Sequence, residues 1–74
     1  MEKYKQKIIT VNKFEANSII NYLQKDYAAA SAGVFNLKEN GQIKIQSYED
    51  KIEFLCDCSK RVINELEEII EQNE

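Results

Sequence analysis

The stretch that decides the fold runs from Ile52 to Ile70 and reads I-E-F-L-C-D-C-S-K-R-V-I-N-E-L-E-E-I-I. Its apolar residues fit two periods. At the start they alternate, which is typical of a strand with one buried face. Over the whole stretch they also recur at helical spacing, within an arc of about 140° at 3.6 residues per turn. The alternating set is Ile52, Phe54, Cys56 and Cys58, and the helical set is Ile52, Leu55, Cys56, Ser59, Val62, Ile63, Leu66, Ile69 and Ile70.

The larger number of matching positions favours one continuous helix from about Tyr48 to Gln72, with Ser47 as its N-cap. Such a helix would be about 37 Å long at 1.5 Å per residue. The alternative, a fourth strand made by the alternating set, stays open. On the helix, Phe54 and Cys58 fall outside the main apolar stripe. We therefore expect these two side chains to contact a partner or a second subunit.

A strand and a helix are predicted upstream. The β-branched run that ends the segment Tyr4–Val11 predicts the strand. Asn12 follows as a helix N-cap, with Glu15 in the capping-box position three residues later. The apolar stripe of this helix consists of Ala16, Ile19, Ile20, Leu23 and Tyr27. The helix is expected to end within residues 26–32, an alanine-rich segment that fits either extra helical turns or an irregular loop.

Two further strands, V-F-N-L-K and Q-I-K-I-Q, are separated by Glu-Asn-Gly. A two-residue Asn-Gly turn would place apolar and charged side chains on the same face. A three-residue loop over 39–41 instead pairs Leu37 with Ile43, and Gly41 then takes the left-handed conformation of a bulge. That register gathers four apolar side chains on one face: Phe35, Leu37, Ile43 and Ile45. Burial of one face therefore favours the three-residue loop.

The predicted order is β-α-β-β-α, an α+β two-layer sandwich that forms one small domain over residues 1–74. Both helices would cover one face of a three-stranded sheet that contains the antiparallel hairpin. On the other, polar face Lys38 and Lys44 are candidates for a nucleic-acid or anion contact, joined by Lys5 and Lys7 if the first strand turns them that way. Because Arg61 is the single arginine, we expect nucleic-acid binding only weakly or within a larger complex.

The composition argues against catalysis and metal binding. The chain has no histidine, and its two cysteines, Cys56 and Cys58, are separated by one residue. A disulfide between them would be badly strained, and Cys-x-Cys is not one of the paired zinc-ligand patterns. A nucleophile elbow, a phosphate-binding glycine loop and a zinc-protease motif are all missing. We therefore expect a non-enzyme without catalytic residues, cofactor or metal, its thiols reduced as in a cytoplasmic protein.

Size and charge favour a protein that acts through its surface. A chain of 74 residues buries roughly 60% of its unfolded surface, so without a disulfide or metal we expect support from a homodimer. No apolar run approaches the ~20 residues of a membrane span, and the charged start does not resemble a signal peptide. The C-terminal third is acidic, and Glu65, Glu68 and Glu71 are candidates for contact with a basic partner.

Three segments resemble a known family in order and length: E-A-N-S-I-I-N-Y-L-Q-K-D, G-V-F-N-L-K-E-N-G-Q-I-K-I and E-D-K-I-E-F-L-C-D-C-S-K-R-V-I-N-E-L-E-E-I-I. They are similar to the small dimerising subunit of the KEOPS tRNA-modifying complex. The resemblance implies a non-catalytic accessory dimer that binds a larger catalytic subunit and supports N6-threonylcarbamoyladenosine formation on tRNA. The alternative is a small acidic protein of a phage or mobile element that inhibits a host nucleic-acid-binding or defence complex.

Overall fold

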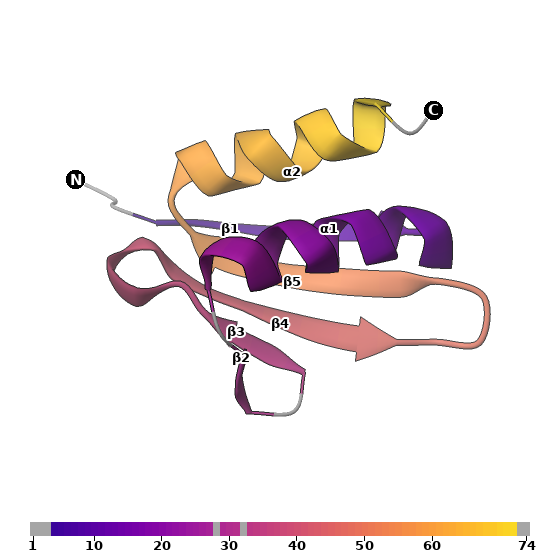
Figure 1. The fold of residues 1–74 in the computed structure, drawn as a ribbon, viewed down its shortest axis with the longest axis horizontal. Coiled ribbons are helices and arrows are strands. Elements are labelled where there is room, and N and C mark those ends of the chain that lie inside the picture. The colour runs from indigo at the N-terminus through magenta and orange to yellow at the C-terminus, as the bar shows by residue number, and fades with distance from the viewer. Residues whose placement is uncertain (1–3, 28, 32, 73–74) are drawn as a thin grey trace.

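Two helices lie on one face of an antiparallel sheet (Figure 1). The computed structural model describes residues 4–27, 29–31 and 33–72. The elements are β1 (Lys5–Val11), α1 (Lys13–Asp26), β2 (Ala29–Ser31), β3 (Val34–Asn36), a 3-10 turn (Lys38–Asn40), β4 (Gly41–Ser47), β5 (Ile52–Cys58) and α2 (Lys60–Gln72). The strand order is β1-β5-β4-β3-β2. The α+β class is confirmed, whereas the three-stranded sheet is wrong: β5 is the fourth strand that had stayed open as the alternative, and the short edge strand β2 was not predicted.

β5 corrects the expectation of one helix from Tyr48 to Gln72. It pairs with β1 on one side and β4 on the other along its whole length. The alternating set faces the helices, and three of its four members are buried: Phe54, Cys56 and Cys58. Alternation prevails over the helical period because a central strand satisfies its backbone groups on both sides while every second side chain enters the core.

The start of each helix is fixed by a local hydrogen-bond pattern. The Asn12 side chain accepts from the Glu15 amide at 2.7 Å, and the Glu15 carboxylate accepts from the Asn12 amide at 3.3 Å. This confirms the predicted capping box. α2 begins after Ser59, whose carbonyl accepts from the Val62 amide at 3.1 Å. Ser47, the expected cap of the long helix, is instead the last residue of β4.

The β3–β4 turn has the expected three residues, but they are 38–40 rather than 39–41. Phe35 pairs with Ile43, and the Leu37 amide donates to the Gly41 carbonyl at 2.8 Å. This register differs by two residues from the predicted one. Because an even shift keeps each side chain on its face, the apolar residues of the hairpin still point toward the helices. Lys38 takes a φ of 58° within the turn.

Gly41 lies against the backbone of β5. Its φ of 108° is positive, but with a ψ of −144° this is not the predicted left-handed conformation of a bulge, and the residue starts β4 instead of lying in the loop. A Cβ atom at this position would clash with the Asp57 carbonyl oxygen and would lie 2.8 Å from the Cα atom of Cys58. Glycine is therefore required by close contact with the neighbouring strand as well as by its dihedral angles.

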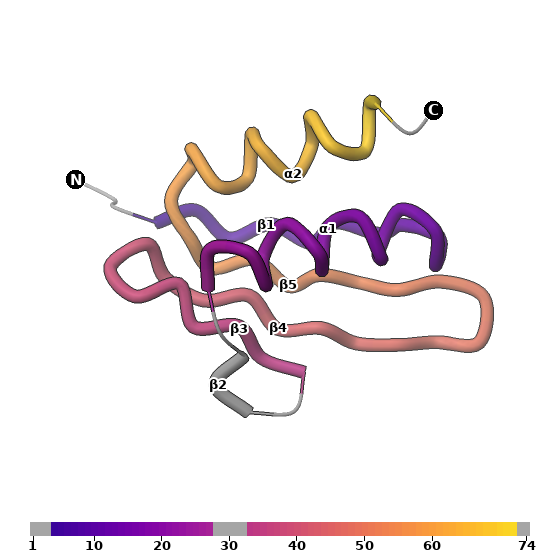
Figure 2. Tube along the Cα trace, viewed as in Figure 1, coloured from indigo at the N-terminus to yellow at the C-terminus, as the bar shows by residue number. Residues whose placement is uncertain are grey.

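One end of the molecule joins four parts of the chain, as the trace in Figure 2 shows: the start of β1, the end of α1, the β3–β4 turn and the start of α2. The Tyr4 hydroxyl donates to the Glu39 carbonyl at 2.6 Å. The Ser59 amide donates to the Asn40 carbonyl at 2.9 Å, and the Asn40 side-chain amide lies 3.4 Å from the Tyr27 hydroxyl. These bonds hold the turn against the ends of both helices.

The core fills the space between the helices and the sheet. Its buried members are Ile9, Val11, Ala16, Ile19, Leu23, Phe35, Leu37, Ile43, Phe54, Cys56, Cys58, Val62, Ile63 and Leu66. Phe54 is the largest of those with no exposed surface. Within the described part of the chain, no helix is both long and apolar enough to cross a bilayer.

Replacement of the central aromatic residue tests this core. We expect Phe54→Ala to lower the free energy of unfolding by about 3–5 kcal/mol, because it leaves a cavity where Phe54 has no exposed surface. Phe14→Ala is the control: Phe14 is 69% exposed, so the change should stay within about 0.5 kcal/mol. Urea unfolding followed by circular dichroism measures both, with Phe54→Leu as a milder variant if the alanine variant does not fold. Equal losses for Phe54→Ala and Phe14→Ala would contradict the fold.

Candidate protein-docking surface

The residues expected to contact a partner lie in two different environments. Phe54 and Cys58 have no exposed surface, so their expected place outside the core is wrong and a partner cannot reach them. Glu68 and Glu71 are exposed on α2, and Glu65 is half-buried. The burial of Phe54 and Cys58 was missed because a helical period was assumed for this segment. On a strand these residues share a face with the core residues, whereas on a helix they do not.

The lysines do not gather into one basic patch. Lys44 is exposed on the sheet face away from the helices, whereas Lys38 lies in the β3–β4 turn. Lys5 and Lys7 are opposite Cys58 and Cys56 in the β1–β5 register, so they face the helix side. Among the strand residues whose side chains the structure describes, Lys44 is thus the one lysine on the open face. The separated lysines do not provide the concentrated positive charge that the expected nucleic-acid contact would need.

The open face instead carries a row that crosses four strands. In register, Ile8 of β1 is opposite Leu55 of β5, Leu55 is opposite Lys44 of β4, and Lys44 is opposite Val34 of β3. Ile8 is 61% exposed, and Leu55 and Val34 are half-buried. The neighbouring row consists of Gln6, Asp57, Gln42 and Asn36. We call the two rows together the open-face patch.

The open-face patch is hollowed at its centre. The depression has a volume of about 470 Å³, and the side chains of the patch that line it are Gln6, Ile8, Gln42, Lys44, Leu55 and Asp57. An apolar centre with amide groups and one charge of each sign around it is typical of a protein–protein contact. In the described part of the chain, no three histidine, cysteine or acidic side chains gather closely enough to hold a metal ion.

The sequence contained a signal for this patch that the prediction did not use. Ile8 is followed directly by Ile9, and neighbouring residues on a strand point to opposite faces. Since Ile9 is buried under the helices, Ile8 has to lie on the open face. The same reasoning applies to Leu55, which stands between the buried Phe54 and Cys56.

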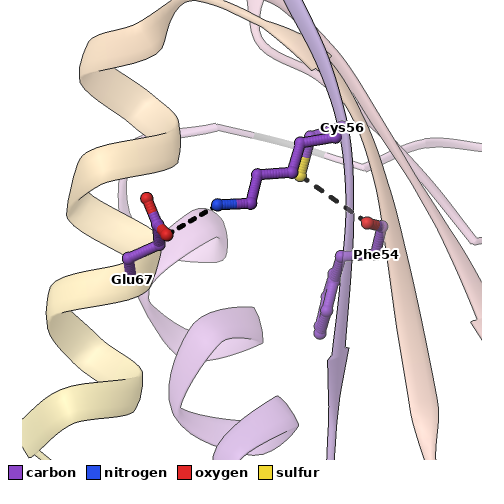
Figure 3. Close-up of polar contacts among 4 residues, drawn as sticks. Phe54, Cys56 and Glu67 are labelled. Atoms are coloured by element: carbon purple, nitrogen blue, oxygen red, sulfur yellow. Dashed lines mark hydrogen bonds and ion pairs between the residues drawn. The ribbon is translucent and has the colours of Figure 1, made fainter.

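An ion pair connects the edge strand β1 to α2 (Figure 3). The Lys7 ammonium lies 2.7 Å from the Glu67 carboxylate, and the two side chains are 38% and 47% exposed. A pair this accessible to water contributes at most about 1 kcal/mol. Lys7 is opposite Cys56, and the Cys56 thiol lies 3.7 Å from the Phe54 carbonyl, to which it donates. A lysine is tolerated on the helix side because its stem can extend to the surface.

Local contacts change the acidity of three groups. The neighbouring Cys58 thiol, together with burial, raises the pKa of Cys56. The Cys56 thiol lowers the pKa of Cys58, while burial acts against that lowering. At the tip of the β4–β5 hairpin, the Glu53 charge raises the pKa of Tyr48. With both cysteines buried and free, the pair is suited to a place in the core and not to attack on a substrate.

Thiol reactivity tests the burial of this pair. We expect Cys56 and Cys58 of the native protein to react with Ellman's reagent only as fast as the chain unfolds, because the thiolate is the reactive form and neither thiol is accessible. In denaturant both should react at once. Asn64→Cys, which places a third thiol on the exposed side of α2, is the control and should react rapidly in the native state. Rapid reaction of the native pair itself would contradict the burial.

Comparison with known proteins does not add to the geometry: no family model, no curated protein and no solved structure matches the chain. The resemblance to the small KEOPS subunit therefore stays a prediction.

Proposed function

We propose that this chain is a non-catalytic adaptor that docks a larger protein through the open-face patch. The observation that carries the proposal is the exposure of Ile8 beside Leu55. Among the described residues the large exposed apolar side chains are Ile8, Phe14 and Tyr48. Of these, Ile8 pairs directly with a second apolar side chain across the sheet and lines the hollow with it.

The energetics favour a contact at this patch. Covering an exposed isoleucine stabilises a complex by up to about 1.5–3 kcal/mol, and Leu55 extends the same apolar centre. The amides of Gln6 and Gln42 are available to a partner at the rim of the hollow. Lys44 and Asp57 add one positive and one negative charge, which orient a partner more than they strengthen its binding.

The finer proposal concerns the partner. By the resemblance, it is the larger catalytic subunit of a tRNA-modifying complex of the KEOPS kind, and the chain is its accessory subunit. The order β1-α1-β3-β4, with α2 closing the chain, supports this proposal, whereas β2 and β5 are two strands beyond the expected order and β5 replaces the first part of the expected closing helix. Specific co-purification of an ATPase-like tRNA-modification subunit would support it.

An acidic side chain at the centre of the patch tests docking. Leu55→Glu should weaken capture of the partner from a lysate of the source cells at least about tenfold, because the complex would bury a charged carboxylate in place of an apolar side chain. The fold should persist, since Lys44 is directly opposite this position. Phe14→Glu, at an exposed apolar position on α1, is the matched control and should capture the same proteins as the parent chain. Identical capture by both variants, followed by equal affinities for the purified partner, would refute docking through this patch.

A second function is supported by the charge of α2. Glu65, Glu68 and Glu71 recur every three residues along the helix, so they follow one side of it. The salt bridge found among the described residues joins Lys7 to Glu67 and leaves those three carboxylates without a cationic partner. We propose as the alternative that this acidic side blocks a basic, nucleic-acid-binding surface of a host complex.

Charge reversal separates the two functions. If α2 is an inhibitory surface, Glu65→Lys with Glu68→Lys should abolish binding to a basic target, and binding by the parent chain should weaken as salt rises. The control is Glu49→Lys with Asp50→Lys, the same charge change at the exposed tip of the β4–β5 hairpin. Unchanged binding by the helix variant would exclude the inhibitor and leave the open-face patch as the docking site.

A further inference from the structure

We propose that β1 pairs with the β1 strand of a second copy of this chain, so that two sheets join into one across a two-fold axis at Ile8. β1 is the last strand at its side of the sheet, and none of the described strands pairs with its outer edge along its seven residues. A long, uncovered edge strand is a template for pairing with another chain. The inference rests on the proposed function in one respect, namely that the chain acts by association, but it concerns the edge of β1, which shares Gln6 and Ile8 with the open-face patch.

The alternation of hydrogen bonds across the sheet shows which backbone groups of β1 point away from the sheet and can bond to a second chain. The Tyr48 amide donates to the Lys51 carbonyl at 2.9 Å, and the Ile45 amide donates to the Gly33 carbonyl at 2.6 Å. Hydrogen-bonded and non-hydrogen-bonded pairs alternate along two antiparallel strands. The even-numbered residues of β4 therefore bond to odd-numbered residues of β5. The even-numbered residues of β5 are left to bond to odd-numbered residues of β1. The backbone groups of Gln6, Ile8 and Thr10 therefore point outward from the edge.

These outward groups select one register for a two-fold pairing. With Ile8 opposite Ile8 of the second copy, Gln6 is opposite Thr10 at both ends, and each of these pairs exchanges two hydrogen bonds. A shift of the axis to Lys7 would lose one of the pairs and would bring two lysines face to face. A shift to Ile9 would also lose a pair. The axis at Ile8 uses all three outward residues.

The side chains on the open face agree with this register. Ile8, 61% exposed in the single chain, would pack against its own symmetry mate. Leu55 is the next residue in the same row on each side. The apolar row would then run without interruption from Leu55 of one copy to Leu55 of the other, which removes the most exposed isoleucine of the described chain from water.

The helix side of the edge is self-complementary in charge. A second hollow, of about 460 Å³, is lined by Lys7, Ile8, Ile9, Glu67, Ile70 and Glu71. The neighbours Ile8 and Ile9 point to opposite faces yet both line it, so it lies along the strand edge. Because Glu67 is paired with Lys7, it lies level with Lys7 along β1.

Glu71 lies one helical turn beyond Glu67. At 1.5 Å per helical residue and about 3.3 Å per strand residue, that turn advances by about two strand positions, which places Glu71 beside Ile9. In the selected register Ile9 is opposite Lys7 of the second copy. The two-fold axis therefore brings Glu71 of each copy to Lys7 of the other, and it does so twice.

Charge reversal at this contact tests the inference. The parent chain, measured by light scattering from micromolar to millimolar concentration, should reach twice its mass of 8.6 kDa. Glu71→Lys should raise the dimer dissociation constant at least about fivefold, because it replaces two ion pairs with two like-charge contacts. Glu68→Lys is the matched control: it makes the same change on the same helix, outside the hollow, and should leave the constant unchanged.

A cross-link reads the register directly. Opposite residues of a hydrogen-bonded antiparallel pair have Cα atoms about 5.5 Å apart, which suits a disulfide. Ile8→Cys should therefore form an intermolecular disulfide under mild oxidation at least about tenfold faster than Gln46→Cys, an exposed open-face position on β4. The native cysteines do not interfere because both are buried.

The possible outcomes separate this inference from the proposed function. A monomer at every concentration, a dimer insensitive to Glu71→Lys, or equal cross-linking by the two cysteine variants would each overturn the edge pairing. A dimer that fulfils all three expectations but captures no partner would support the pairing and count against the adaptor. Capture of a partner by a strictly monomeric chain would do the reverse.

Discussion

The structure depends on β5, which is bonded to a neighbour on each side and buried on one face. Its pairing with β1 and β4 joins the first strand of the chain to the hairpin, so without it the sheet would be divided. Its alternate side chains place Phe54 and two thiols beneath the helices. The other functional features follow from this arrangement. The odd-numbered residues of β5, which point away from the helices, form the centre of the open face. β1 lies at the edge of the sheet because β5 pairs with its inner side.

Local signals predicted those elements that local interactions determine. The capping box at Asn12 gave the start of α1, and its apolar stripe gave the face of α1 that is buried. The buried face of the hairpin was also predictable. Burial depends on whether the residue number is odd or even, and an error of two residues in register does not change that.

The elements missed by the sequence interpretation are those that depend on distant residues. For residues 52–58 the apolar pattern fits either a strand or a helix. The strand forms because β1 and β4 each provide a neighbouring strand with which it can pair. The strand β2 has no alternation of its own and pairs with β3 over three residues. For the candidate site, Lys38 and Lys44 were placed on the polar face by the alternation of the hairpin, whereas the face of Lys5 and Lys7 was left open. The separation of Lys5 and Lys7 from Lys44 follows from the register of β1 against β5, which no single segment encodes.

Gly41 shows how a distant strand can determine a local turn. Two alignments of residues 34–47 put the same apolar side chains on one face, so the hairpin by itself has no strong reason to choose between them. In the folded chain, the missing side chain of Gly41 lets the backbone of β5 approach at Asp57, and sliding the hairpin by two residues would bring a side-chain-bearing residue into that position. The hairpin is thus aligned by its third strand. Cut out as a peptide, the same residues would be free to exchange between two alignments, and one of these would become dominant only when the C-terminal half of the chain docks.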